Sequence, residues 1–154
     1  TGNLHLTIKF LGEIEENKTD QVKHTLAQAL KDQNCFDIEI AGLGMYPNKR
    51  APRVIWLGIV GASPLKEVYQ VINRELTALD LTPERRAFSP HLTIARIRKH
   101  TDRQQAQQIG EILSTYKVES LGLTTIKQVH LYQSVLTPSG PIYTLLHSVD
   151  LNQV

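Results

Sequence analysis

Apolar and polar residues alternate along several short stretches of the chain, which is the period-two pattern of a β-strand with one buried face. The first such stretch is 3–11, where Leu4, Leu6 and Ile8 alternate with polar residues. The other stretches predicted as strands are 36–40, 53–60, 91–97, about 125–136 and about 142–151. Stretch 53–60 is almost continuously apolar, which is typical of a central strand covered on both faces.

Three stretches between the predicted strands carry apolar residues at the spacing of an amphipathic helix. They are 18–31, 63–80 and 102–114. Ser63 and Pro64 give the second helix an N-cap and a proline at the first helical position. In the third helix we expect Ile109, Ile112 and Leu113 to face inward.

The turn-forming clusters at 46–52 and 137–141 each join two predicted strands as an antiparallel hairpin. The order strand, helix, hairpin, helix, strand, helix, hairpin resembles one short motif used twice. We therefore predict an α+β protein with a single bilobal domain over 1–154, whose pseudo-symmetric halves are about 1–85 and 86–154. Each lobe would be an antiparallel sheet with helices on its outer face, and the active-site groove would lie between the lobes.

The composition favours a folded globular protein. Hydrophobic residues make up 41% of the chain and charged residues 21%. The apolar runs are far shorter than the roughly 20 residues of a membrane span, and we expect a cytoplasmic protein. A net charge of +2 is too small for bulk binding to long nucleic acids, so an acidic ligand would be bound locally. The single cysteine, Cys35, fits a reducing compartment, and we expect it in the core.

The tetrapeptide His-Leu-Thr-Ile occurs twice, at 5–8 and at 91–94, each time inside a predicted strand. Residues two apart on a strand share a face and lie about 7 Å apart, so each histidine would stand beside its threonine. If the two halves pack about a pseudo-twofold axis, the two pairs meet across a groove. Such a pocket, with two imidazoles and two hydroxyls, suits a phosphodiester.

The chemical reason is that in-line attack on a phosphodiester requires one proton to leave the nucleophile and another to reach the leaving oxygen. An imidazole has an unperturbed pKa of about 6.5, so two histidines are suited to both transfers near neutral pH. Threonine hydroxyls and a nearby arginine could bind the non-bridging oxygens. This chemistry requires no metal and no cofactor. A two-histidine metal site is the alternative, although neither motif contains Asp, Glu or Cys at ligand spacing.

Residues 3–14 (NLHLTIKFLGEI) and 88–97 (FSPHLTIARI) resemble the two signatures of the two-histidine (2H) phosphoesterases. Within that superfamily the chain is similar to the bacterial and archaeal RNA 2′,3′-cyclic phosphodiesterases, once called 2′-5′ RNA ligases. The similarity extends to 53–60 and 131–146. It implies a monomeric hydrolase that opens 2′,3′-cyclic phosphate ends of RNA or nucleotides to 2′-phosphomonoesters, with reverse 2′-5′ ligation as a further activity.

The resemblance also implies a role for each site residue. His5 would donate a proton to the leaving 3′ oxygen, and His91 would accept one from water. The phosphate ligands would be Thr7, Thr93 and Arg96. Strand periodicity places Arg96 on the face opposite His91, so a bulge or the end of the strand must re-aim it.

Family members carry a strand and a helix ahead of the first motif, where only Thr1 and Gly2 precede Asn3 here. We therefore expect the first lobe to be incomplete. The rival to an enzyme is a non-catalytic module that binds nucleotides or RNA ends in the same groove.

Two other groups of side chains could contact RNA. Basic residues gather near the second motif and in the first hairpin, where they form either a track for an RNA backbone or a solvated face. They are Arg85, Arg86, Arg96, Arg98, Lys99, Lys49, Arg50 and Arg53. Tyr46 is a candidate for stacking on a base, whereas Trp56 is expected in the core.

Overall fold

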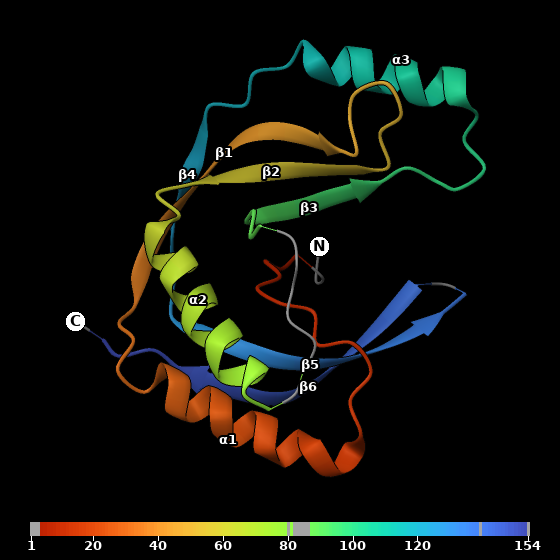
Figure 1. The fold of residues 1–154 in the computed structure, drawn as a ribbon. Coiled ribbons are helices and arrows are strands. Elements are labelled where there is room, and N and C mark those ends of the chain that lie inside the picture. Colours follow the sequence, from red (N-terminus) through yellow and green to blue (C-terminus); the bar gives the residue numbers. More distant parts are fainter. Residues whose placement is uncertain (1–3, 80, 82–86, 139, 154) are drawn as a thin grey trace. The chain divides into compact units, whose positions relative to one another are not determined.

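The computed structural model describes residues 4–79, 81, 87–138 and 140–153. In chain order the elements are η1 (Glu16–Lys18), α1 (Thr19–Leu30), β1 (Phe36–Tyr46), β2 (Val54–Val60), α2 (Ser63–Thr77), β3 (His91–Arg96), α3 (Arg103–Ser114), β4 (Ser120–Ile126), β5 (Gln128–Thr137) and β6 (Gly140–Asp150) (Figure 1). The strands form a four-stranded sheet and a two-stranded sheet, which confirms the predicted α+β class.

The chain forms two compact units, and each is assembled from separate stretches of sequence. The first unit contains Thr1–Ile8, Asp37–Ser63 and Phe88–Thr124. The second contains Lys9–Phe36, Pro64–Ala87 and Thr125–Val154. Neither unit is a continuous half of the chain, whereas the repeated element order had suggested halves at 1–85 and 86–154. The physical reason is strand pairing, because β3 joins the β1–β2 hairpin across the thirty residues that separate Val60 from His91.

The first unit is built on a sheet with the strand order β3-β2-β1-β4, and β2 pairs antiparallel with both β1 and β3. Helix α3 begins after Asp102, whose carboxylate accepts a hydrogen bond from Gln105 N at 2.8 Å. The prediction that Ile112 faces inward is wrong, because its side chain is 58% exposed. The buried positions are Ala106 and Gly110, since the helix lies so close to the backbone of Lys49 that a Cβ on Gly110 would overlap it.

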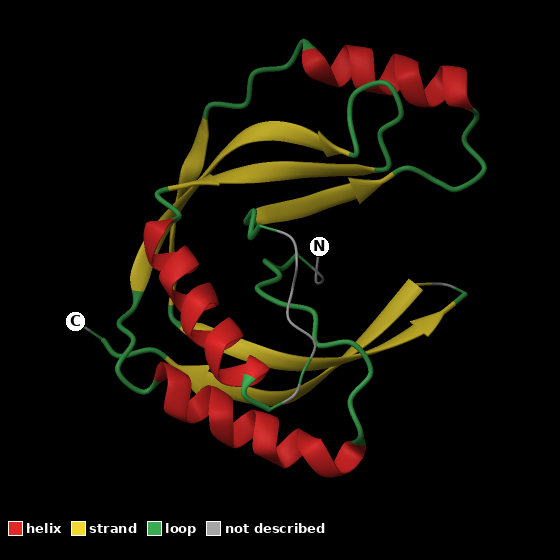
Figure 2. Cartoon of the chain, viewed as in Figure 1, coloured by secondary structure: helices red, strands yellow, loops and turns green. Residues whose placement is uncertain are grey.

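The second unit contains α1, α2 and the β5–β6 hairpin, shown as red helices and yellow strands in Figure 2. The predicted apolar stripes of both helices are buried, as are Val129 of β5 and Leu151 directly after β6. These core residues are Val22, Leu26, Leu30, Leu65, Val68, Ile72, Leu76, Val129 and Leu151. Cys35 is half-buried rather than in the core, and its thiol lies 3.5 Å from the Leu151 carbonyl oxygen.

Two strand predictions need correction. The stretch 125–136 is not one strand, because β4 ends at Ile126 and belongs to the four-stranded sheet, while β5 begins at Gln128 and pairs with β6. The stretch 3–11 is not a regular strand: within its described part, Leu6 forms an isolated antiparallel bridge to Leu92. Leu4 and Phe10 are 54% and 75% exposed, so their alternation does not mark a buried face.

No described helix is long and apolar enough to cross a membrane.

Candidate active site

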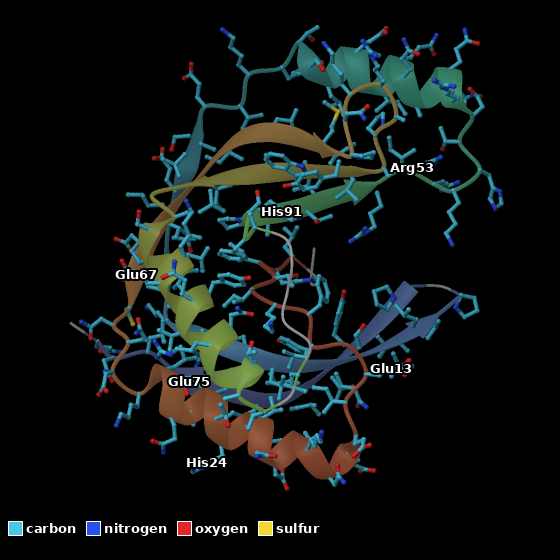
Figure 3. All side chains as sticks on the ribbon, in the orientation of Figure 1. Glu13, His24, Arg53, Glu67, Glu75 and His91 are labelled. Carbon is cyan, nitrogen blue, oxygen red and sulfur yellow. The ribbon has the colours of Figure 1, made fainter. Side chains whose placement is uncertain are left out.

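Strand β3 places His91 and Thr93 on one face of the four-stranded sheet. His91 pairs with Gly58 and Thr93 with Trp56, two positions of β2 that share a face. Both residues are half-buried. Figure 3 shows His91 at the start of β3, where the strand emerges from the preceding loop. The second His-x-Thr pair is therefore displayed as strand periodicity predicts.

Arg96 lies on the same face of the sheet as His91, although simple alternation predicts the opposite. The β2–β3 register shifts between Ile55 and Trp56, so that Trp56 pairs with Thr93 but Ile55 pairs with Ala95. One extra residue of β3 is accommodated there, which is a β-bulge. Beyond it Arg96 pairs with Val54, two positions from Trp56 and on its face. The bulge therefore turns Arg96 to the sheet face of His91, which regular alternation would not do.

The first motif lies beside β3, on the edge of the sheet that β2 does not occupy. Leu6 bridges Leu92 in antiparallel orientation, and each residue is the second position of its motif. Antiparallel geometry then puts His5 opposite Thr93 and Thr7 opposite His91. His5 and His91 are then diagonal neighbours, and residues in this relation are about 7 to 8 Å apart. Strand pairing inside the first unit therefore brings the two motifs together.

One hydrogen bond selects the tautomer of the neutral His91 ring. Its Nδ1 lies 2.8 Å from the Ser89 carbonyl oxygen. A carbonyl oxygen only accepts, so Nδ1 carries the proton and Nε2 keeps its lone pair in the neutral ring. The hydroxyls of Tyr46 and Ser89 are 3.2 Å apart and share a hydrogen bond. Ser89 was not singled out from the sequence, but its position before Pro90 restricts it to extended backbone, which was a usable signal.

Aromatic rings pack around His91. The Tyr46 ring meets it edge-on with centroids 5.2 Å apart, and the Trp56 ring lies at 5.9 Å. The Trp56 indole covers Gly44, where a Cβ would overlap the ring. Trp56 is half-buried and its Nε1 is enclosed without a hydrogen-bond partner. Tyr46 and Trp56 thus pack against the imidazole of His91.

The electrostatic setting of the site is cationic. Arg96, Arg98 and Lys99 are exposed, and none is in an ion pair among the described residues. Arg85 and Arg86, which the sequence analysis grouped with them, lie outside the described residues. Within the part of the chain that the structure describes, no group of three or more His, Cys, Asp or Glu side chains is placed to hold a metal ion.

The fold and the site together define an α+β protein with two His-x-Thr motifs side by side and Arg96 on the same sheet face as His91. Comparison with known families agrees: the sequence model of the 2′-5′ RNA ligase superfamily matches residues 2–135. The chain belongs to this superfamily, which confirms the resemblance to the 2H phosphoesterases.

Two curated relatives with the same name illustrate the similarity. The RNA 2′,3′-cyclic phosphodiesterase of Methanothermobacter thermautotrophicus is 34% identical over 143 residues, covering 92% of this chain and 75% of that protein. The protein of the same name from Methanocaldococcus jannaschii is 37% identical over 144 residues, covering 94% of this chain and 78% of that protein.

Solved structures show the same fold. The crystal structure of TT0787 of Thermus thermophilus superposes with a TM-score of 0.76 at 24% identity, covering 96% of this chain and 78% of that chain. E. coli LigT complexed with 3′-AMP gives a TM-score of 0.76 at 22% identity, covering 99% of this chain and 79% of that chain.

Proposed function

We propose that this chain opens the 2′,3′-cyclic phosphate ends of RNA or nucleotides to 2′-phosphomonoesters. One observation carries the proposal: the Leu6–Leu92 bridge puts each histidine opposite the threonine of the other motif. Proton donor, proton acceptor and hydroxyl ligands then surround one small area. The names of the curated relatives support the same substrate class.

His91 is the base in this proposal. Because its Nδ1 proton is held by the Ser89 carbonyl, Nε2 is the nitrogen that accepts a proton from the attacking water. The water oxygen forms the new bond to phosphorus, and the bond from phosphorus to the 3′ oxygen breaks. The 2′ oxygen keeps the phosphate.

His5 is the acid. In its protonated form it donates a proton to the departing 3′ oxygen, so the reaction ends with a neutral His5 and a protonated His91. Thr7, Thr93 and Arg96 bind the non-bridging phosphate oxygens, with Arg96 supplying charge-assisted hydrogen bonds. When a 5′ hydroxyl replaces water as the nucleophile, the same proton transfers apply: the 5′ oxygen bonds to phosphorus, the bond from phosphorus to the 3′ oxygen breaks, and a 2′-5′ linkage results.

We further propose that residues 1–154 work as a single 2H phosphoesterase domain, that the protein acts as a monomer, and that it works in the cytoplasm. Cysteine usage supports the last point, because the single Cys35 is unpaired with any other cysteine and suits a reducing compartment. Size-exclusion chromatography with light scattering tests the monomer directly.

The test of the function is incubation with an RNA oligonucleotide ending in a 2′,3′-cyclic phosphate, in excess EDTA, over about pH 5 to pH 9. We expect a 2′-phosphate product, a bell-shaped pH profile and no loss of rate in EDTA, because two imidazoles perform the proton transfers. A 3′-phosphate product would contradict the assignment of the leaving oxygen. Tight binding of intact substrate by the folded protein would make it the non-catalytic module.

A further inference from the structure

The two segments that flank the site contain only basic charges. Residues 40–62 and 87–101 include no Asp or Glu. Their cations are Lys49, Arg50, Arg53, Arg96, Arg98 and Lys99, and every one is exposed. We call this set the basic surface. A chain whose net charge is only +2 has therefore gathered much of its positive charge in one place.

The structure brings these cations to one end of the β2–β3 pair. Arg53 directly precedes β2, and its carbonyl accepts a hydrogen bond from Ile97 N at 3.0 Å. The Arg53 guanidinium donates to the Arg98 carbonyl at 3.4 Å. Arg96 closes β3 opposite Val54. Figure 3 shows Arg53 at this end of the strands and His91 at the other.

No described acidic side chain neutralises the basic surface. The ion pairs among the described residues involve other lysines and arginines. Asp102 follows the Arg98–Lys99 turn, but its carboxylate caps α3 through Gln105 N. Like charges held together raise the energy of the folded chain, and nothing in the fold requires them here. An anionic ligand would remove this cost.

The position of the basic surface relative to the histidines selects the kind of anion. Because of the bulge, the rise from His91 to Arg96 matches the four β2 positions from Gly58 to Val54, about 13 Å at 3.3 Å per residue. Arg96 is thus the member of the basic surface assigned to the reacting phosphate, and Arg98 and Lys99 lie beyond it. A cyclic nucleotide bound at His91 is too short to reach Arg98 and Lys99. A chain of phosphodiesters leading to the same cyclic end is long enough.

We infer that the basic surface binds the sugar-phosphate backbone of single-stranded RNA on the 5′ side of the cyclic end. The inference rests on the proposed function for the identity of the bound end. It makes the protein selective for oligonucleotides over mononucleotides without reading their sequence, because phosphate contacts position a strand but do not specify its bases.

The experiment compares two ligands that do not react further: a fluorescent single-stranded RNA oligonucleotide ending in a 2′-phosphate, and adenosine 2′-monophosphate. The variant combines Arg98→Ala with Lys99→Ala. It keeps the backbone carbonyl of residue 98, which accepts the hydrogen bond from Arg53. The matched control is Lys66→Ala with Lys127→Ala, which removes two exposed cations from the second unit. Affinities are measured by anisotropy or competition over a range of salt concentrations, and circular dichroism verifies folding.

We expect the Arg98 and Lys99 variant to bind the oligonucleotide roughly tenfold or more weakly at low salt and to lose about 1.4 from the slope of log affinity against log salt, about 0.7 per phosphate contact. Its affinity for the mononucleotide and both affinities of the control should stay at the wild-type values. Unchanged oligonucleotide binding, an equal loss in the control, or an equal loss for the mononucleotide would each overturn the inference.

Turnover of the cyclic oligonucleotide, measured alongside, separates the two proposals. Wild-type binding with the expected pattern but no hydrolysis would refute the proposed function and leave the basic surface established. Hydrolysis with unchanged binding in the variant would refute the basic surface alone.

Discussion

The two copies of His-Leu-Thr-Ile have the same sequence but different surroundings. The second copy begins β3, and His91 is half-buried among Tyr46 and Trp56 with its Nδ1 held by Ser89. The first copy is in contact with β3 through the Leu6 bridge, lies outside the regular strands, and has an exposed His5. Identical residues therefore do not guarantee identical local structure.

This difference explains how one sequence motif can supply both the proposed base and the proposed acid. A base needs a defined lone pair aimed at the nucleophile, and the Ser89 carbonyl provides that for His91. An acid must regain a proton from solvent after each turnover, and the exposure of His5 allows this. The surroundings of each histidine, and not the motif, suit it to its proposed role.

The largest effect should come from removing either imidazole. His5→Ala and His91→Ala should each lower kcat roughly 10²-fold or more, with little change in KM, because each removes one proton transfer. The two variants should differ in their pH profiles: His91→Ala loses the rise at low pH and His5→Ala loses the fall at high pH. Initial rates on the cyclic-phosphate oligonucleotide across pH measure both.

His24→Ala, an exposed histidine on α1, is the matched control and should behave as wild type. If the two catalytic variants lost the opposite limbs, the roles of His5 and His91 would have to be exchanged. Wild-type turnover in both would end the two-histidine mechanism.

The next effect tests whether Arg96, which the bulge puts on the sheet face of His91, binds the phosphate. Arg96→Met should lower kcat/KM about 10- to 100-fold, which corresponds to about 1.5 to 3 kcal/mol for hydrogen bonds from a charged group. The control is Arg103→Met, an exposed arginine at the start of α3. Equal kcat/KM values in the two variants would place Arg96 outside the phosphate site, whatever its face.

A smaller effect should follow from disturbing the packing of Gly44, Trp56 and His91. Gly44→Ala places a Cβ into the Trp56 ring and should cost about 1 to 3 kcal/mol of unfolding free energy, measured by urea denaturation. Because Trp56 packs against His91, kcat should fall too. Adding Trp56→Phe, a smaller ring, should restore part of the stability in a double-mutant cycle. Strictly additive losses would show that the ring and Gly44 do not interact.

The smallest effect should come from Tyr46→Phe, which keeps the ring against His91 but removes the hydroxyl shared with Ser89. An exposed neutral hydrogen bond is worth about 0.5 to 1.5 kcal/mol, so kcat should fall about two- to tenfold with KM unchanged. Tyr132→Phe on β5 is the control. A change in KM without a change in kcat would instead assign Tyr46 to substrate binding.

Much of the fold could be predicted because helix and strand periodicity is local. The stripe from Leu65 to Leu76 in α2 is buried as expected, and β2 is a central strand as expected. The expectation that β2 is covered on both faces is wrong, because only Leu57 of this strand is buried. Predictions failed where the outcome depended on partners distant in sequence. Ile112 is exposed because Gly110 makes the close approach to Lys49, and alternation in 3–11 could not show that Leu6 alone of its described residues would pair with β3.

The sequence by itself determined the residue types of the site, since both His-x-Thr pairs and Arg96 are written in it. It also determined the helices and most strands, because those depend on neighbours a few positions away. Only the tertiary structure decided that Leu6 meets Leu92, that a bulge turns Arg96 to the face of His91, and that Ser89 holds Nδ1. These features depend on register and on contacts between separate segments, and the free energy of such pairing is not encoded in any single stretch of the chain.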